Sequence, residues 1–126
     1  MLKDATPVPT LATADIEKAK DFYDGLGFTH AEGDLPGGIM YTAGTGGFFI
    51  YTSAFAGTNK ATGMSFDVSD EEFDAIIAEL RAKGLAFDTF DVPEAEWTDG
   101  VLSGMGMRSV WFRDPDGNIL NVSTTH

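Results

Sequence analysis

The feature that most constrains the fold of this chain is a pattern that occurs twice. Residues 6–13 are typical of a strand. Asp15, or alternatively Thr13, is the expected N-cap of a helix, and the apolar spacing that follows predicts a helix that ends at Gly25 and Gly27. Three short strands are then expected, at residues 28–32, 39–42 and 48–52. An internal repeat of this kind restricts the possible folds more strongly than any single motif.

The second copy begins with the alternating segment 64–68. Ser69 and Glu72 form a capping box at the start of a second helix, worth about 1 kcal/mol, and Gly84 ends that helix. Its apolar stripe consists of Phe73, Ile76, Ile77 and Leu80. Strands are then predicted at 87–92, 105–113 and 118–123, with a long loop at 93–104 that carries Trp97.

The repeat predicts the α+β class. One domain, residues 1–126, would contain two tandem modules of strand, helix and three strands, at about 5–53 and 62–124. Placed side by side, such modules would form a curved, cup-shaped mixed sheet with the helices on the outside.

The composition limits the partners of the chain. Eight basic and twenty acidic residues give a formal net charge of −12, so a polyanion such as DNA would be repelled. Cysteine is absent, which excludes disulfides and thiolate chemistry. The sequence lacks both the apolar segment of a secretory leader and an apolar run that could span a bilayer. We therefore expect a cytoplasmic protein without nucleic-acid or membrane partners, whose acidity serves solubility or attracts a cationic ligand.

Two stretches of the sequence carry a family resemblance. Residues 14–28 read ADIEKAKDFYDGLGF, and residues 112–118 read FRDPDGN. Both are similar to signatures of the vicinal oxygen chelate superfamily, also called the glyoxalase, bleomycin-resistance and dioxygenase fold. Each also has a folding role: Phe22 and Tyr23 are expected to bury against a sheet, and the second stretch has turn chemistry. Together with the repeat, the resemblance covers nearly the whole chain.

Metal-dependent members of that superfamily hold an ion with His, Glu or Gln at four positions inside the cup. The resemblance aligns these positions with Val8, Ile50, Gly63 and Asn121. None of these residues is a usual ligand of a transition metal. His30 is expected to be a surface or packing residue, and His126 is the last residue. We therefore expect no metal and no cofactor, while a hard-metal site that includes Asp67 stays open.

The same strands predict the lining of a binding cup, because side chains two residues apart share a face. Asn121 is expected opposite Trp111 in the last hairpin, and Met40 beside Ile50. Trp97 could cover a ligand or enter a dimer interface. The predicted ligand-binding residues are Met40, Phe48, Ile50, Ser65, Trp97, Met107, Trp111 and Asn121. For the first three, a place in the core is the alternative.

The resemblance is closest to the metal-free, antibiotic-binding branch of the superfamily. It implies a non-catalytic protein that gives resistance by sequestering an aromatic or cationic natural-product antibiotic in a cleft of a homodimer, with exchange of the first strands left open. The alternative is a metal-dependent lyase, isomerase or dioxygenase of the same superfamily. A third interpretation is a structural or regulatory domain whose own side chains fill the cup.

Overall fold

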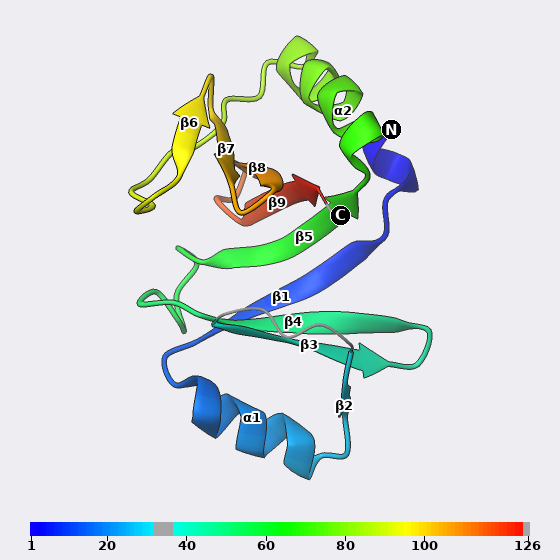
Figure 1. Cartoon of the computed structure of the whole chain (residues 1–126), viewed down its shortest axis with the longest axis vertical. Helices are drawn as coiled ribbons and strands as arrows, with labels where there is room; N and C mark the ends of the chain where they lie inside the picture. Colours follow the sequence, from blue (N-terminus) through cyan, green and yellow to red (C-terminus); the bar gives the residue numbers. More distant parts are fainter. Residues whose placement is uncertain (32–36, 125–126) are drawn as a thin grey trace. The chain divides into compact units, whose positions relative to one another are not determined.

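The computed structural model describes residues 1–31 and 37–124. The chain divides into two compact units. The N-terminal unit is Val8–Met64, and the C-terminal unit combines Met1–Pro7 with Ser65–His126. Each unit contains one α-helix and several strands, which confirms the predicted α+β class (Figure 1).

The N-terminal unit follows the predicted order of elements. These are β1 (Pro7–Thr13), α1 (Ile16–Gly25), β2 (Thr29–His30), β3 (Gly38–Ala43) and β4 (Gly46–Thr52). The strand order is β2-β3-β4-β1, with β3 antiparallel to both neighbours and β1 parallel to β4. Asp15 caps α1 as predicted, since its carboxylate accepts hydrogen bonds from the backbone N–H groups of Glu17 and Lys18.

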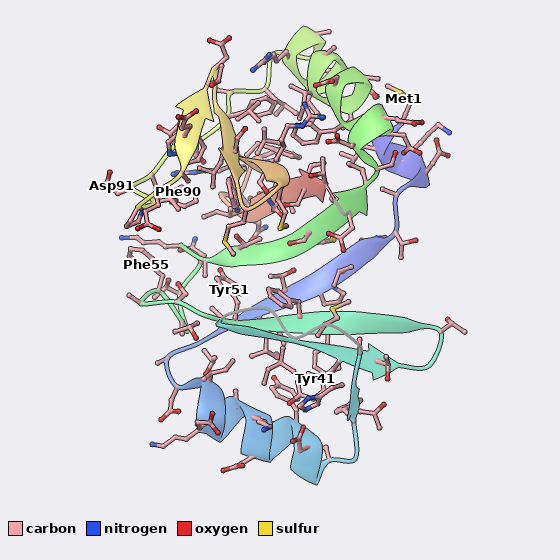
Figure 2. All side chains as sticks on the ribbon, viewed as in Figure 1. Met1, Tyr41, Tyr51, Phe55, Phe90 and Asp91 are labelled. Carbon is pink, nitrogen blue, oxygen red and sulfur yellow. The ribbon has the colours of Figure 1, made fainter. Side chains whose placement is uncertain are left out.

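The core of the N-terminal unit lies between α1 and the sheet. Tyr41, which is labelled in Figure 2, is fully buried there. The other core and packing residues are Ile39 and Ile50, with Ile16, Ala19, Tyr23, Phe28 and Phe48 against them. The expectation that Phe22 buries with Tyr23 is wrong, because Phe22 is 61% exposed. The buried stripe of α1 follows Ile16, Ala19 and Tyr23, and a side chain one position away points elsewhere on a helix.

The C-terminal unit contains α2 (Asp70–Ala82) and a set of strands on which this helix packs. Its strands are β5 (Thr62–Val68), β6 (Glu96–Thr98), β7 (Val101–Gly104), β8 (Met107–Arg113) and β9 (Ile119–Thr124). They lie in the order β5-β9-β8-β7-β6. The first residues of β5 belong to the N-terminal unit. A 3-10 turn (Leu2–Asp4) precedes β1, and Leu2 packs on the core of this unit. The predicted stripe of α2 is buried, and the Ser69 hydroxyl accepts a hydrogen bond from the backbone N–H of Glu72.

The second half differs from the prediction in one segment. Residues 87–92 do not form a strand, and the predicted loop at 93–104 contains the β6–β7 hairpin instead. The hairpin turns at Asp99 and Gly100, whose φ angles are both positive, at 51° and 82°. An Asp-Gly pair between two apolar runs favours this two-residue turn, because its twist matches that of the flanking strands. The C-terminal unit therefore carries one strand more than the predicted module.

Three further predictions concern the ends of segments and membrane association. The predicted strand at 28–32 is confirmed only at Thr29 and His30, and residue 32 lies outside the described residues. His126 also lies outside them. Neither described helix is long and apolar enough to cross a bilayer.

Candidate functional site

The sheet of the C-terminal unit has two chemically different faces. Val110, Phe112 and Val122 pack with α2 in the core. Because side chains alternate along a strand, Trp111 and Asn121 lie on the opposite face. The register pairs these two residues directly, as predicted. We call this side the tryptophan face; on the central strands it consists of Ser109 and Trp111 of β8 and Asn121 and Ser123 of β9.

The β6–β7 hairpin brings a second tryptophan to the same face. Trp97 pairs with Leu102, and Leu102 pairs with Ser109. The centroids of the Trp97 and Trp111 rings are 6.0 Å apart. The ring of Phe90 lies 5.3 Å from Trp97 and 4.9 Å from Trp111, at 74° to each. We call Phe90, Trp97 and Trp111 the open aromatic cluster.

Phe90 is the member of this cluster that sequence analysis missed. It lay inside the strand predicted at 87–92, where nothing distinguished it from a core residue. In the structure it is 48% exposed, and its carbonyl oxygen accepts a hydrogen bond from Trp97 Nε1 at 3.0 Å. The Asp99-Gly100 turn was a signal for the hairpin that places Trp97 on a strand of the sheet, but it gave no information on Phe90.

Asn121 belongs to a buried chain of hydrogen bonds. Its Nδ2 donates to the carbonyl oxygen of Val110 at 3.1 Å, and its Oδ1 accepts from the Ser123 hydroxyl at 2.9 Å. The hydroxyls of Ser109 and Ser123 are 2.7 Å apart. Since each hydroxyl has one proton and that of Ser123 goes to Asn121, Ser109 is the donor to Ser123. The Asn121 amide is therefore a fixed part of the sheet, bonded at both its nitrogen and its oxygen.

The residues at the four aligned positions do not fit a metal ion. Val8 and Gly63 have no ligating atom in their side chains, and the Asn121 amide is already hydrogen-bonded. Ile50 packs in the core against α1. Within residues 1–31 and 37–124, no three His, Asp or Glu side chains gather as a metal site requires. His30 instead lies 2.8 Å from the carboxylate of Asp24.

Three of the predicted site residues belong to the N-terminal unit, and the structure changes the interpretation of all three. Phe48 and Ile50 pack against the core beneath α1, so the alternative that they are core residues holds. Met40 is not opposite Ile50, because the register pairs Ile39 with Ile50 and Met40 with Phe49. Met40 therefore lies on the other face of that sheet from Phe48 and Ile50.

The other predicted site residues share one face of the C-terminal sheet. Met107 lies two residues before Ser109 on β8, so it shares the face of Ser109 and Trp111. Ser65 alternates with Phe66 and Val68, which pack with the core around α2, so Ser65 lies on the side of the tryptophan face. The five predicted residues on this side are Ser65, Trp97, Met107, Trp111 and Asn121.

The electrostatic surroundings of the tryptophan face are acidic. Asp67 of β5 lies on the same side as Ser65, and partial burial raises the pKa of its carboxyl although the residue keeps contact with solvent. No Lys or Arg occurs between Gly84 and Met107, whereas the same segment contains Asp88, Asp91, Glu94, Glu96 and Asp99. Arg113 forms an ion pair with Asp88 at 2.8 Å. The remaining carboxylates give the segment that carries Phe90 and Trp97 a negative potential, which favours cations.

Comparisons with known proteins identify the family. The sequence pattern of the Glyoxalase/Bleomycin resistance protein/Dioxygenase superfamily matches residues 7–122. The chain belongs to this superfamily, as the sequence resemblance predicted. A search of curated proteins gives no significant match.

Two solved structures support the fold. One is described as an NAD-dependent benzaldehyde dehydrogenase from Legionella pneumophila, with 20% identity, a TM-score of 0.66 and coverage of 96% of this chain and 100% of that chain. The other is a glyoxalase/bleomycin resistance protein/dioxygenase superfamily member from Vibrio splendidus 12B01, with 15% identity, a TM-score of 0.57 and coverage of 96% and 99%. At these identities the likeness shows the fold alone.

Proposed function

We propose that this protein binds a small aromatic or cationic natural product on the tryptophan face and leaves it chemically unchanged. In a producing or exposed cell, such binding would give antibiotic resistance by sequestration. The observation that carries the proposal is the open aromatic cluster, in which two indole rings and a half-exposed phenyl ring lie on a strand face beside a polar network.

The chemistry of this face suits retention of a ligand better than its conversion. Indole rings bind flat molecules and cations through their faces, which supplies affinity without reactive groups. The polar atoms of Ser109, Asn121 and Ser123 hydrogen-bond to one another or to the backbone, so none is activated by a neighbouring base. Membership of the superfamily is compatible with this function, although the fold also occurs with other activities.

The homodimer expected from the sequence remains part of the proposal, together with a ligand cleft at its interface. Sedimentation equilibrium at several protein concentrations, with and without a bound ligand, measures the assembly directly. If the protein is monomeric under both conditions, the ligand does not bind in a dimer cleft, and the tryptophan face would be a site within one chain.

The function is tested by binding and recovery. Isothermal titration with planar cationic antibiotics and with aromatic polyketide antibiotics should give a saturable site, and mass spectrometry should recover each ligand unmodified after prolonged incubation. Expression in a sensitive host should raise the inhibitory concentration of the bound compound, and Trp111→Ala should abolish that protection. Recovery of a modified ligand, or one equivalent of transition metal in protein purified without chelators, would show that the protein is an enzyme instead.

A further inference from the structure

The rings of the open aromatic cluster pack against one another, so each covers part of the ring surface that a ligand would contact. Their centroids are 4.9 to 6.0 Å apart. A flat ring stacked between two others needs about 7 Å between them, twice a contact distance of about 3.5 Å, whereas the two indoles are tilted by 58° and have centroids only 6.0 Å apart. A ligand ring therefore has no space between these side chains as they stand. Phe90 contacts both tryptophans and fills the position that a ligand ring would take against them.

The contacts of Phe90 allow its side chain to move away from the two indoles. It lies on the loop before β6, next to Asp91 (Figure 2), and it belongs to no helix or strand. The loop is tied at one end, where the backbone N–H of Asp88 donates to the carbonyl oxygen of Trp111 at 2.8 Å. Phe90 itself is held by the hydrogen bond from Trp97 and by its ring contacts, and 48% of it is exposed. Moving its side chain outward disturbs neither the core around α2 nor a strand ladder.

The charge of the loop indicates what kind of molecule would replace Phe90. Three acidic residues lie between Phe90 and Trp97 in the sequence: Asp91, Glu94 and Glu96. The segment from Gly84 to Met107 contains no Lys or Arg that could neutralise them. Indole faces attract cations, and carboxylates nearby add to that attraction. A planar organic cation can stack on the indoles and is attracted by the carboxylates. A planar anion can also stack, but the carboxylates repel it.

We propose that Phe90 is an internal occupant of the binding site, and that a planar aromatic cation displaces it from Trp97 and Trp111. This inference rests on the proposed function, because it concerns the same face. It assigns Phe90 the role of a specificity residue: a ligand binds only if it contacts the two indoles better than the phenyl ring does. The affinity of the unmodified protein is then reduced by the fraction of molecules in which Phe90 fills the site.

The test uses the fluorescence of the protein itself. Trp97 and Trp111 are the two tryptophans of the chain, so quenching of indole emission reports on this cluster. The probe is 10-methylacridinium, compared with uncharged acridine in alkaline buffer, with correction for absorption by the probe. The proteins are the unmodified chain, Phe90→Ala, Phe90→Leu and the control Phe22→Ala, which removes another exposed phenyl ring on α1. Circular dichroism checks that each variant is folded.

Phe90→Ala should bind 10-methylacridinium about 3- to 10-fold more tightly than the unmodified chain, since the competing side chain is gone. Phe90→Leu should fall between them, Phe22→Ala should match the unmodified chain, and acridine should bind more weakly to all four proteins. Unchanged or weaker binding by Phe90→Ala would overturn the inference while leaving the proposed function intact, because Phe90 would then be a wall of the site. Absence of quenching in every protein would overturn the proposed function and the inference together.

Discussion

Two aromatic clusters of the molecule have similar ring spacing and opposite surroundings. In the N-terminal unit, Tyr23, Phe28, Tyr41 and Phe48 have centroids 5.0 to 6.5 Å apart and pack beneath α1; we call them the buried aromatic cluster. In the open aromatic cluster the corresponding distances are 4.9 to 6.0 Å. Tyr41 is fully buried, whereas Phe90 is 48% exposed.

The difference lies in which side of a sheet the rings occupy. The buried cluster is on the side that α1 covers, so its rings stabilise the unit. The open cluster is on the side of its sheet away from α2, so its rings have no helix of that unit over them. Ring content and ring spacing therefore do not distinguish a core from a binding surface, and the position relative to the helix does. Substitutions in the two clusters should therefore have different consequences, for stability in one and for binding in the other.

Removing a ring from the buried cluster should cost the most stability. Tyr41→Ala deletes a fully buried side chain, and large-to-small changes of this kind typically cost about 3–5 kcal/mol. Urea unfolding followed by circular dichroism measures the loss. Phe90→Ala is the matched change in the open cluster, and we expect it to cost less than about 1 kcal/mol because the ring is half-exposed. Equal losses for the two variants would contradict the distinction.

Removing an indole ring from the open cluster should instead weaken binding. Trp111→Ala should weaken the binding of 10-methylacridinium by about 30-fold, on the order of 2 kcal/mol, as for a tryptophan at the centre of a binding surface. Isothermal titration measures the change. Phe48→Leu is the control, since it alters the buried cluster and keeps an apolar side chain there. A larger loss of affinity in Phe48→Leu than in Trp111→Ala would place the site elsewhere.

The turn that presents Trp97 should tolerate little change. Gly100 has a φ of +82°, and a Cβ there would lie 3.1 Å from the Cβ of Phe87. Gly100→Ala should therefore destabilise the hairpin by about 1–2 kcal/mol and reduce quenching by the probe, because Trp97 is displaced. Asp99→Asn keeps a favoured turn pair and should leave both quantities nearly unchanged. Gly100→Ala with normal stability would show that the hairpin turn does not need a positive φ at this position.

The smallest effect concerns one hydroxyl of the buried cluster. Tyr41 donates a hydrogen bond to the Asp24 carboxylate at 3.0 Å, and burial together with this bond raises the pKa of Tyr41 to about 12. Tyr41→Phe should cost about 1 kcal/mol at neutral pH. Since the folded state favours the protonated phenol, its contribution is complete below the ordinary tyrosine pKa and disappears as the pH rises through about 12.

An alkaline titration followed by tyrosinate absorbance checks this assignment. Tyr41→Phe should remove an ionisation step near pH 12 from the titration curve. If the variant keeps the step near pH 12, that step does not belong to Tyr41, and its hydroxyl is not buried in solution.

Much of the fold was predictable because it depends on local chemistry. Spacing along the chain was enough to predict three features of the fold. These are the buried stripe from Phe73 to Leu80, the helix caps at Asp15 and Ser69, and the pairing of Trp111 with Asn121. The errors concern features that depend on contacts between segments distant in the sequence. The segment predicted as a strand at 87–92 forms none and meets β8 through the hydrogen bond from the backbone N–H of Asp88 to Trp111, whereas β7 of the Asp-Gly hairpin pairs with β8.

The candidate site was predictable in part for the same reason. Five of the eight predicted residues share the side of the tryptophan face because period-two alternation and a hairpin turn fix their direction. For Phe48 and Ile50 the alternative of a core position holds, and the sequence could not decide it, since alternation gives two faces without saying which of them the helix covers. Phe90 could not be assigned at all, because a residue outside a strand has no alternation to follow.

Residue type and short-range spacing were enough to predict most of the elements, the superfamily and the absence of side chains suited to a metal at the aligned positions, and the β6–β7 hairpin was the exception. Tertiary structure decided which aromatic rings form a core and which form a surface. That outcome depends on where α1 and α2 pack, and helix packing is set by the summed contacts of many side chains distant in the sequence.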